Sequence, residues 1–262
     1  MRHLKIQNYL SLFLIILFVN LACSDTGTNV EDELAPEIPD LSQGIPEFDF
    51  FKGKVTSSIE QTAGENFVIA SSLTSAVEAI MISFSTLPTS FTASADGVEA
   101  SFNNGIWEWS YTSAGAGASV TIRLTAEVKI VQTNWAMYLS ASNGEISFDN
   151  YKFIDGFVKN SSNGGEWNFY AFKEESTTPV MSYTWDVESE TDAVFTVTFG
   201  ESSFSSLTYV KDLPDNTLTI TDEASSSSII YWNSTTGTGY VETSAQGQVC
   251  WDENGDNVVC PS

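Results

Sequence analysis

The sequence predicts a mainly β protein: a single antiparallel β-meander of about eleven to thirteen strands, curved into an open sheet or half-barrel, with one N-terminal helix packed on it. Three observations predict this class. From Val98 onward, apolar and polar residues alternate with a period of two; turn signals separate these segments at short, even intervals; and residues 65–85 repeat apolar residues every three or four positions. The short connections favour pairing between successive strands.

The first residues have the features of a secretory signal. Arg2 and Lys5 supply a positive start, and Leu10–Val19 is an apolar run that ends shortly before Cys23. This run is too short to cross about 30 Å of hydrocarbon as a stable helix. We therefore divide the chain into a signal peptide (residues 1–22), an acidic tether that contains proline (23–50), and a domain of helix plus antiparallel sheet that ends in a cysteine hairpin (51–262).

The end of the signal, Asn20-Leu21-Ala22-Cys23, resembles the lipobox of bacterial lipoproteins, although an aliphatic residue is usual at the position of Asn20. The resemblance implies that Cys23 is diacylated and becomes the new N-terminus. Two or three acyl chains hold a protein stably to a membrane. The acidic stretch after Cys23 also resembles the surface-export signal of Bacteroidota lipoproteins. We expect an outer-membrane lipoprotein of the cell envelope, and both a surface-exposed and a periplasm-facing position remain open.

The tether and the whole chain are strongly acidic. Eight acidic residues lie between Asp25 and Asp49, with prolines at 36, 39 and 46, so this segment is expected to be extended rather than packed. The chain has 34 acidic and 10 basic residues and a formal net charge of −24. Such a field repels nucleic acid, and we exclude nucleic acid as a partner.

Residues 65–85 are the one segment with helical periodicity. Thr62-x-x-Glu65 has the pattern of a capping box, and Pro88 is expected to stop the helix. A single helix with one apolar face needs a sheet to cover that face. The residues expected on this face are Ile69, Leu73, Ala76, Val77, Ile80, Phe84 and Leu87.

The strands carry alternating patterns and many aromatic residues. The segment "VTIRLTAEVKI" (120–130) places six apolar residues, from Val120 to Ile130, on one face. An aromatic-x-aromatic pattern recurs at Trp107/Trp109, Trp167/Phe169 and Tyr183/Trp185, which we interpret as core and cross-strand pairs.

Two cysteines close the sequence, in "CWDENGDNVVC". In an exported protein, Cys250 and Cys260 are expected to form a disulfide. A two-residue turn at Asn254-Gly255 would place Cys250 opposite Val259, so either the turn is of another type or the bridge is diagonal. Asp252, Asn254 and Asp256 alternate as at the start of a calcium loop, but Asn257 stands where that loop needs glycine. We favour a structural loop, and cation binding stays open.

The sequence lacks the residues of most catalytic sites. Its one histidine, His3, lies in the signal, which removes His-dependent catalysis and His-ligated metals. There is no phosphate-binding glycine loop, and we expect no metal and no cofactor. A carboxylate pair would be the remaining route, with Glu108, Glu166 and Asp186 beside aromatic residues. In a strand, the neighbour of an inward aromatic residue points outward, so we expect these acids to be solvated and the protein not to be an enzyme.

These observations favour a lipid-anchored envelope protein with a non-catalytic structural or binding role. The chain as a whole resembles uncharacterised Bacteroidota lipoproteins, a resemblance that implies no activity; an envelope protein is one possible partner. An apolar-ligand carrier is an alternative, because one helix plus a long meander is similar to the periplasmic lipoprotein-carrier fold; it requires a cavity of about 300 Å³ or more. Another alternative is glycan binding, which requires two or more exposed, coplanar rings; the candidates are Tyr138, Tyr170, Phe172 and Tyr231.

Overall fold

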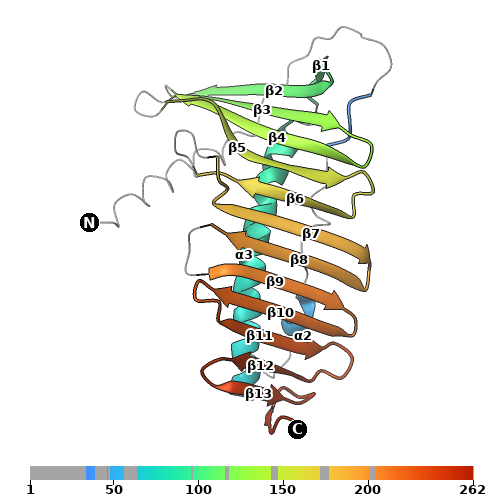
Figure 1. Cartoon of the computed structure of the whole chain (residues 1–262), viewed down its shortest axis with the longest axis vertical. Helices are drawn as coiled ribbons and strands as arrows, with labels where there is room; N and C mark the ends of the chain where they lie inside the picture. The colour runs from blue at the N-terminus through green and yellow to red at the C-terminus, as the bar shows by residue number, and fades with distance from the viewer. Residues whose placement is uncertain are drawn as a thin grey trace, which may run out of the picture.

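A single antiparallel sheet, which is not closed, runs through the domain and confirms the predicted fold class (Figure 1). The computed structural model describes residues 34–38, 46, 48–55, 64–95, 97–115, 118–142, 147–171, 177–200 and 204–261, with the backbone alone at 53–55, 84–94, 113–115 and 118. Within these residues, fourteen strands pair in sequence order from β1 to β14.

Two helices precede the sheet, and their bounds and those of the strands are as follows. They are α2 (Asp49–Val55), α3 (Glu65–Ala95), β1 (Ser101–Asn103), β2 (Ile106–Gly115), β3 (Ala118–Val128), β4 (Gln132–Ser142), β5 (Ser147–Lys159), β6 (Gly164–Phe169), β7 (Met181–Ser189), β8 (Asp192–Phe199), β9 (Phe204–Asp212), β10 (Asp215–Asp222), β11 (Ser227–Asn233), β12 (Gly239–Thr243), β13 (Gly247–Trp251) and β14 (Asn257–Val258).

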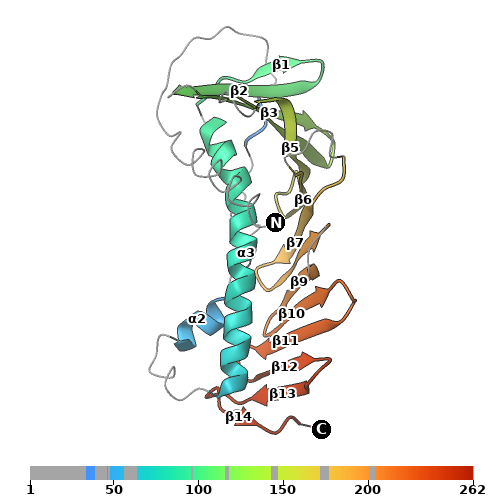
Figure 2. The same ribbon diagram turned by 90° about the vertical axis from the view of Figure 1, so that its left-hand side faces the viewer.

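Helix α3 spans the hollow side of the bowed sheet from end to end (Figure 2). Its most numerous backbone contacts with the sheet are to β2 and β3 near one end and to β12, β13 and β14 near the other. Between these ends, large aromatic side chains fill the space between helix and sheet. All seven tryptophans are buried, which confirms that the aromatic-x-aromatic pairs belong to the core.

The aromatic core continues across neighbouring strands as a series of ring contacts. Tyr209 of β9 lies between Phe195 of β8 and Trp232 of β11, with ring centroids 5.9 and 5.8 Å apart. Phe48, just before α2, packs on Tyr209 at 4.7 Å and is 2% exposed. Phe48 falls in the interval 23–50 that the sequence analysis assigns to the tether, so the packed core includes a residue of that interval.

The helix begins at Glu65 as predicted, but it continues past Pro88 to Ala95, so the expected stop was wrong. A proline inside a helix costs about 3 kcal/mol, which tertiary packing can offset. The helix ends instead before Gly97, whose φ of 83° suits only a residue without a side chain.

The predicted apolar face of α3 was also wrong in its orientation. Ile69 is exposed and Val77 is the one fully buried member of the predicted set among the described side chains. The buried face contains two polar residues, Thr74 and Glu78, which interrupt the apolar periodicity from which the face was predicted. Thr74 donates its hydroxyl to the carbonyl of Ala70 (2.9 Å), and Glu78 accepts from Lys52 of α2 (2.5 Å). The buried members are Phe67, Ala70, Thr74, Val77, Glu78 and Met81.

Several turns depart from the sequence prediction or refine it. Asn104-Gly105, one of the turn signals between the alternating segments, forms a two-residue hairpin turn with φ of 52° and 82°. The expected inward face of residues 120–130 holds at Ile122, Leu124 and Ala126 but fails at its end, where Val128 and Ile130 are 52% and 97% exposed. The reason is that β3 ends at Val128, so Ile130 lies in a turn beyond the sheet.

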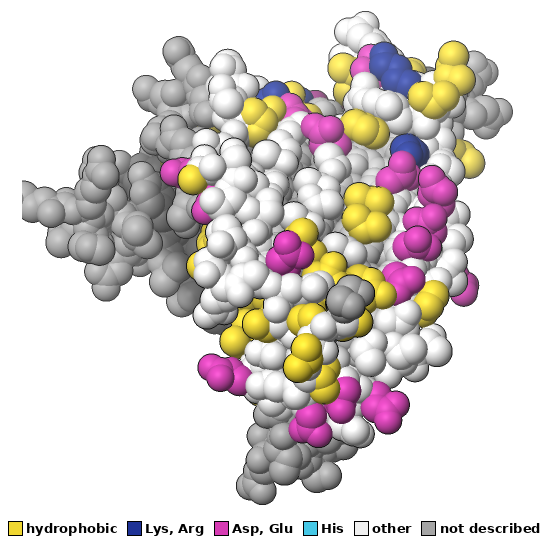
Figure 3. Space-filling view, turned by 60° about the horizontal axis from the view of Figure 1, so that its bottom comes forward, with side chains coloured by type: hydrophobic (Ala, Val, Ile, Leu, Met, Phe, Trp, Pro, Cys, Tyr) yellow, Lys and Arg dark blue, Asp and Glu magenta, His cyan; other side chains and the backbone are white. Residues whose placement is uncertain are grey.

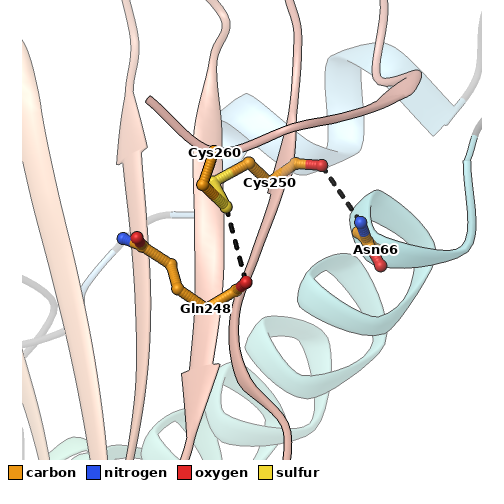
Figure 4. The surroundings of a disulfide bond; sticks show 4 residues. All are labelled: Asn66, Gln248, Cys250 and Cys260. Atoms are coloured by element: carbon orange, nitrogen blue, oxygen red, sulfur yellow. Dashed lines mark hydrogen bonds between the residues drawn. A yellow bond between two sulfur atoms is a disulfide. The ribbon is translucent and has the colours of Figure 1, made fainter. Parts of the chain in front are cut away.

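The C-terminal hairpin resolves the question of the disulfide geometry. Cys250 lies opposite Val258 and Trp251 opposite Asn257, so a five-residue loop, 252–256, joins β13 to β14. The disulfide joins Cys250 to Cys260, two residues beyond the directly opposed position (Figure 4). The turn is therefore not of the two-residue type, and the bridge is diagonal.

Candidate ligand-binding site

A cavity of about 540 Å³ lies between the inner face of β3–β5 and the N-terminal segment Pro36–Ile38. This segment is far from β3–β5 in the sequence and closes one side of the cavity. Its lining includes Pro36, Ile38, Val128, Thr133, Trp135 and Val158.

The register of the sheet explains why these residues meet. Val128, Thr133 and Val158 stand opposite one another on β3, β4 and β5 and form one row across the sheet. In the next row of the inner face, Trp135 lies between Ala126 and Gly156, whose small size leaves room for the indole. Side chains of modest volume at the strand ends therefore border a large indole, and this difference in size leaves space.

Trp135 is the chemically distinctive residue of this cavity. It is 3% exposed and stacks on Trp109 at a centroid distance of 5.8 Å. Its Nε1–H has no hydrogen-bond acceptor among the described residues, a feature it shares with Trp167. A buried donor without a partner costs about 1–3 kcal/mol. Trp135 lines the cavity, so an acceptor atom that reached this N–H from there, on a ligand or a water molecule, would remove that cost.

Polar groups stand at the edge of this apolar site. Glu37, Lys159, Asn160 and Ser162 contribute to its lining. Lys159 forms an ion pair with Asp186 across 2.9 Å, so its charge is already balanced. The arrangement therefore suits a ligand with an apolar body and a hydrogen-bond acceptor.

The predicted residues Tyr138 and Tyr170 lie on the opposite, outer face of the sheet. The guanidinium of Arg123 lies 3.9 Å from the ring centroid of Tyr138, and Nζ of Lys152 lies 4.7 Å from that of Tyr170. The Tyr170 hydroxyl donates to Asp155 (3.0 Å), while burial and this contact raise the pKa of the Tyr170 phenol. Tyr138, Lys152 and Asp155 share an open groove of about 430 Å³.

Tyr231 does not join this group. It stacks on Tyr240 at 5.1 Å and donates its hydroxyl to Asp215. It lies on β11, seven strands from Tyr138 on β4, which is roughly 34 Å across a sheet. Phe172 lies outside the described residues. The described candidates are all half-buried, and each has a cation or a second ring on one face, so they do not form the exposed, coplanar surface that the glycan hypothesis requires.

The candidate catalytic carboxylates are engaged on the outer face. Glu108 pairs with Arg123 (2.9 Å), Asp186 with Lys159, and Glu166 accepts from the side-chain amide of Asn168 (2.8 Å). None of the three acids lines either of the two cavities described above.

In the loop of Asp252, Asn254 and Asp256, the first carboxylate has a structural role. Asp252 Oδ1 accepts hydrogen bonds from the backbone N–H groups of Asn254 (2.9 Å) and Asp256 (3.0 Å). The described residues contain no group of three His, Cys, Asp or Glu side chains placed to hold a metal ion. Cys23, the proposed lipidation site, lies outside the described residues.

Sequence reasoning did not find Trp135 as a site residue. The alternation of apolar and polar residues predicts its strand and its inward direction, but the cavity depends on residues 36–38, about 100 positions earlier. Within α3, the segment Glu65–Ser83 is the one described helix that is long and apolar enough to cross a membrane, judged by length and composition alone. It packs on the sheet, and a third of its residues are buried.

The fold and this site together define an open β-meander braced by one helix, with a ligand-sized cavity at one end. Comparisons with protein-family models, with curated proteins and with solved structures find no match for the chain.

Proposed function

We propose that this chain is a lipid-anchored protein of the cell envelope that binds, without catalysis, a ligand with an apolar body and a hydrogen-bond acceptor. One observation carries the binding role: Trp135, whose buried Nε1–H has no hydrogen-bond partner among the described residues, is one of the residues that line a cavity of about 540 Å³. This volume exceeds the roughly 300 Å³ of the smaller ligand sites in proteins. The apolar-ligand alternative of the sequence analysis therefore gains support over the glycan alternative.

The proposed address rests on the N-terminal sequence and on cysteine pairing. The chain has three cysteines, and the disulfide uses Cys250 and Cys260, which leaves Cys23 as the remaining thiol. A cysteine directly after a signal sequence and before an acidic tether is typical of an acylated N-terminus. Protease shaving of intact cells, with mass spectrometry of the N-terminal peptide, tests acylation and surface exposure together. An unmodified Cys23 would refute the anchorage.

The binding role is testable with palmitic acid that carries a photoreactive diazirine, added to the full-length protein in vesicles. We expect crosslinks to peptides containing Val128, Trp135 or Val158, and competition by unlabelled palmitic acid. Val158→Phe narrows the cavity and is expected to weaken the crosslinks. Crosslinks that ignore the competitor, or that persist undiminished in Val158→Phe, would show that the cavity is not the site.

A pair of matched tryptophan variants isolates the role of the indole N–H. Trp135→Phe removes the unpartnered donor of a residue that lines the cavity and is expected to weaken palmitic acid binding about fivefold to tenfold, as for a hydrogen bond of about 1–1.4 kcal/mol. Trp167→Phe removes the other unpartnered donor, which is not part of the cavity lining. Equal effects of the two variants would mean that Trp135 acts through packing rather than through its N–H.

A further inference from the structure

The turn between β3 and β4 presents an unusual group of exposed apolar side chains. Ile130 is 97% exposed, Val131 69% and Val128 52%, and the three lie within four consecutive residues. Single exposed apolar residues are common on soluble proteins, but neighbouring ones mark contact surfaces. We call Val128–Val131 the apolar turn.

The apolar turn is held in place by hydrogen bonds from outside it. The side-chain amide of Asn160 donates to the carbonyls of Lys129 and Ile130 (both 3.0 Å), and the backbone N–H of Asn160 donates to the carbonyl of Val131 (3.0 Å). Lys129 N–H also donates to the carbonyl of Gln132 (2.8 Å). The turn therefore presents Ile130 and Val131 in a fixed conformation, so contact with a partner costs little ordering entropy.

Chain connectivity brings this turn close to the proposed anchor. Pro36 and Val128 line the same cavity, and Leu34, two residues before Pro36, is itself 93% exposed. The eleven peptide links from Cys23 to Leu34 span at most roughly 37 Å. An acylated Cys23 would therefore keep the apolar turn within reach of the bilayer surface.

The distribution of charge favours the same orientation. Of the six Lys and Arg side chains that the structure describes, Arg123, Lys129, Lys152 and Lys159 belong to β3–β5 or their turns. On the face drawn in Figure 3, Lys and Arg appear only in the upper part, whereas carboxylates extend to the lower end. Lys129 pairs with Glu127 (2.5 Å), so these two charges offset each other beside the apolar turn, whereas the net charge of −24 makes the protein as a whole repel an anionic surface.

We propose that the apolar turn inserts into the lipid surface to which the chain is anchored, with Ile130 and Val131 at the depth of the upper acyl chains. Lys129, between Val128 and Ile130, would reach back to the headgroups, as lysines at membrane interfaces do. The cavity that Val128 borders would then open beside the bilayer, so its ligand would be an amphiphile that enters from the membrane. This geometry rests on the proposed anchorage, but insertion itself is measured separately.

The experiment uses full-length protein in phosphatidylcholine vesicles with an environment-sensitive nitrobenzoxadiazole label at a new cysteine. Ile130→Cys places the label in the apolar turn. Val259→Cys, at a residue 94% exposed beyond β14, is the matched control at the other end of the sheet. We expect a blue-shifted emission and at least fivefold stronger quenching by nitroxide-bearing lipids at position 130 than at 259. The difference should persist in 0.5 M salt, because apolar insertion is not screened.

Two measurements distinguish insertion of the apolar turn from acylation of Cys23. Equal, water-like emission at positions 130 and 259 at saturating vesicle concentration would overturn the insertion, whether or not Cys23 is acylated. The mass of the N-terminal peptide from the same sample reports the anchorage alone. An unmodified Cys23 with a lipid-quenched label at position 130 would refute the anchor and leave the turn as a membrane contact in its own right.

Discussion

The backbone N–H of Asn66, in the first turn of α3, donates a hydrogen bond to Oδ1 of Asn257 in the last strand, at 3.1 Å and across 191 positions of sequence. Two further bonds join the start of α3 to the C-terminal hairpin: the side-chain amide of Asn66 donates to the carbonyl of Cys250 (3.0 Å; Figure 4), and Gly64 N–H, just before the helix, donates to the carbonyl of Gly255 (2.9 Å). The C-terminal hairpin thus satisfies donors that a helix start leaves free. The helix is capped by the far end of the chain.

This cap leads to a first prediction. Asn257→Ala removes the acceptor of Asn66 N–H and is expected to lower the free energy of unfolding by about 1 kcal/mol, the usual effect of losing a helix cap. Urea unfolding followed by far-UV circular dichroism measures the change. Asn254→Ala, in the adjacent loop, is the control and should change the midpoint little. A loss in Asn254→Ala as large as in Asn257→Ala would assign the effect to the loop instead.

The disulfide is expected to support the cap. Cys250 and Cys260 are ten positions apart, and closing a loop of that size stabilises by about 2–3 kcal/mol. The double variant Cys250→Ser/Cys260→Ser should lose about this amount and should also release β14. Adding Asn257→Ala should then cost less than it does alone, because an unrestrained Asn257 caps poorly. Strict additivity in this cycle would show that the disulfide and the cap act independently.

The nonlocal cap illustrates which parts of this fold the sequence could predict. The meander was predictable because alternation and turn residues act within ten positions, as Asn104-Gly105 shows. The expected capping box at Thr62 lies outside the described residues, and the observed cap comes from Asn257. No local pattern signals that contact.

The sequence predicted neither the buried face of α3 nor the binding cavity, and the two failures have related reasons. Thr74 is buried because its hydroxyl is satisfied by its own helix, and Glu78 is buried because Lys52 of another helix pairs with it. Both residues look like surface residues in a hydrophobicity pattern. The cavity beside Trp135 depends on the approach of Pro36 to β3–β5, which is a tertiary event. By contrast, the outward direction of Glu108 and Asp186 follows from strand alternation alone and was predicted.

Two glycines make a further prediction because they are needed for different reasons. At Gly239, a Cβ would lie 2.2 Å from the Trp251 ring and 2.3 Å from the carbonyl oxygen of Tyr231. At Gly247, nothing lies within 4 Å, but φ is +71°. Gly247→Ala should cost about 1 kcal/mol of backbone strain, whereas Gly239→Ala should cost at least twice that, because it displaces a buried tryptophan. Thermal unfolding ranks the two variants, and the reverse order would contradict the close packing at Gly239.

The pair of Lys52 and Glu78 predicts an asymmetry between single and double replacement. Glu78 is 8% exposed, and Lys52 reaches it from α2. Lys52→Met would leave the carboxylate buried without its cation and is expected to destabilise the protein and loosen α2. Lys52→Met/Glu78→Met removes both charges and should recover most of that loss, as buried ion pairs often do when replaced together. Urea midpoints of the three proteins test this. A double variant that is less stable than the single variant would exclude the unpaired, buried carboxylate of Glu78 as the cause of the loss.

Two buried tyrosines predict a loss of stability in alkaline solution. Burial raises the pKa of Tyr183 and of Tyr209 well above the ordinary 10.0, and the Tyr209 hydroxyl donates to Asn216 (2.9 Å). Above pH 10, the unfolded chain releases these protons while the folded protein retains them. The stabilisation is therefore complete below pH 10 and is lost as the pH rises toward the folded values, by up to about 1.4 kcal/mol per pH unit for each tyrosine.

Urea unfolding at pH 8, 9, 10 and 11 measures this loss, and absorbance at 295 nm reports ionisation of the phenols. Tyr209→Phe should be less stable than the native chain at pH 8, because its hydrogen bond to Asn216 is gone. Between pH 10 and 11, however, its stability should fall with about half the tyrosine-dependent slope, since one of the two buried phenols is absent. An unchanged slope in Tyr209→Phe would place the alkaline transition at other groups. Lys52 is the first candidate, because its hydrogen bond to Glu78 raises its pKa above 10.5. The stabilisation from this pair would begin to fall above pH 10.5 and would be lost as the pH rises through the folded pKa of Lys52.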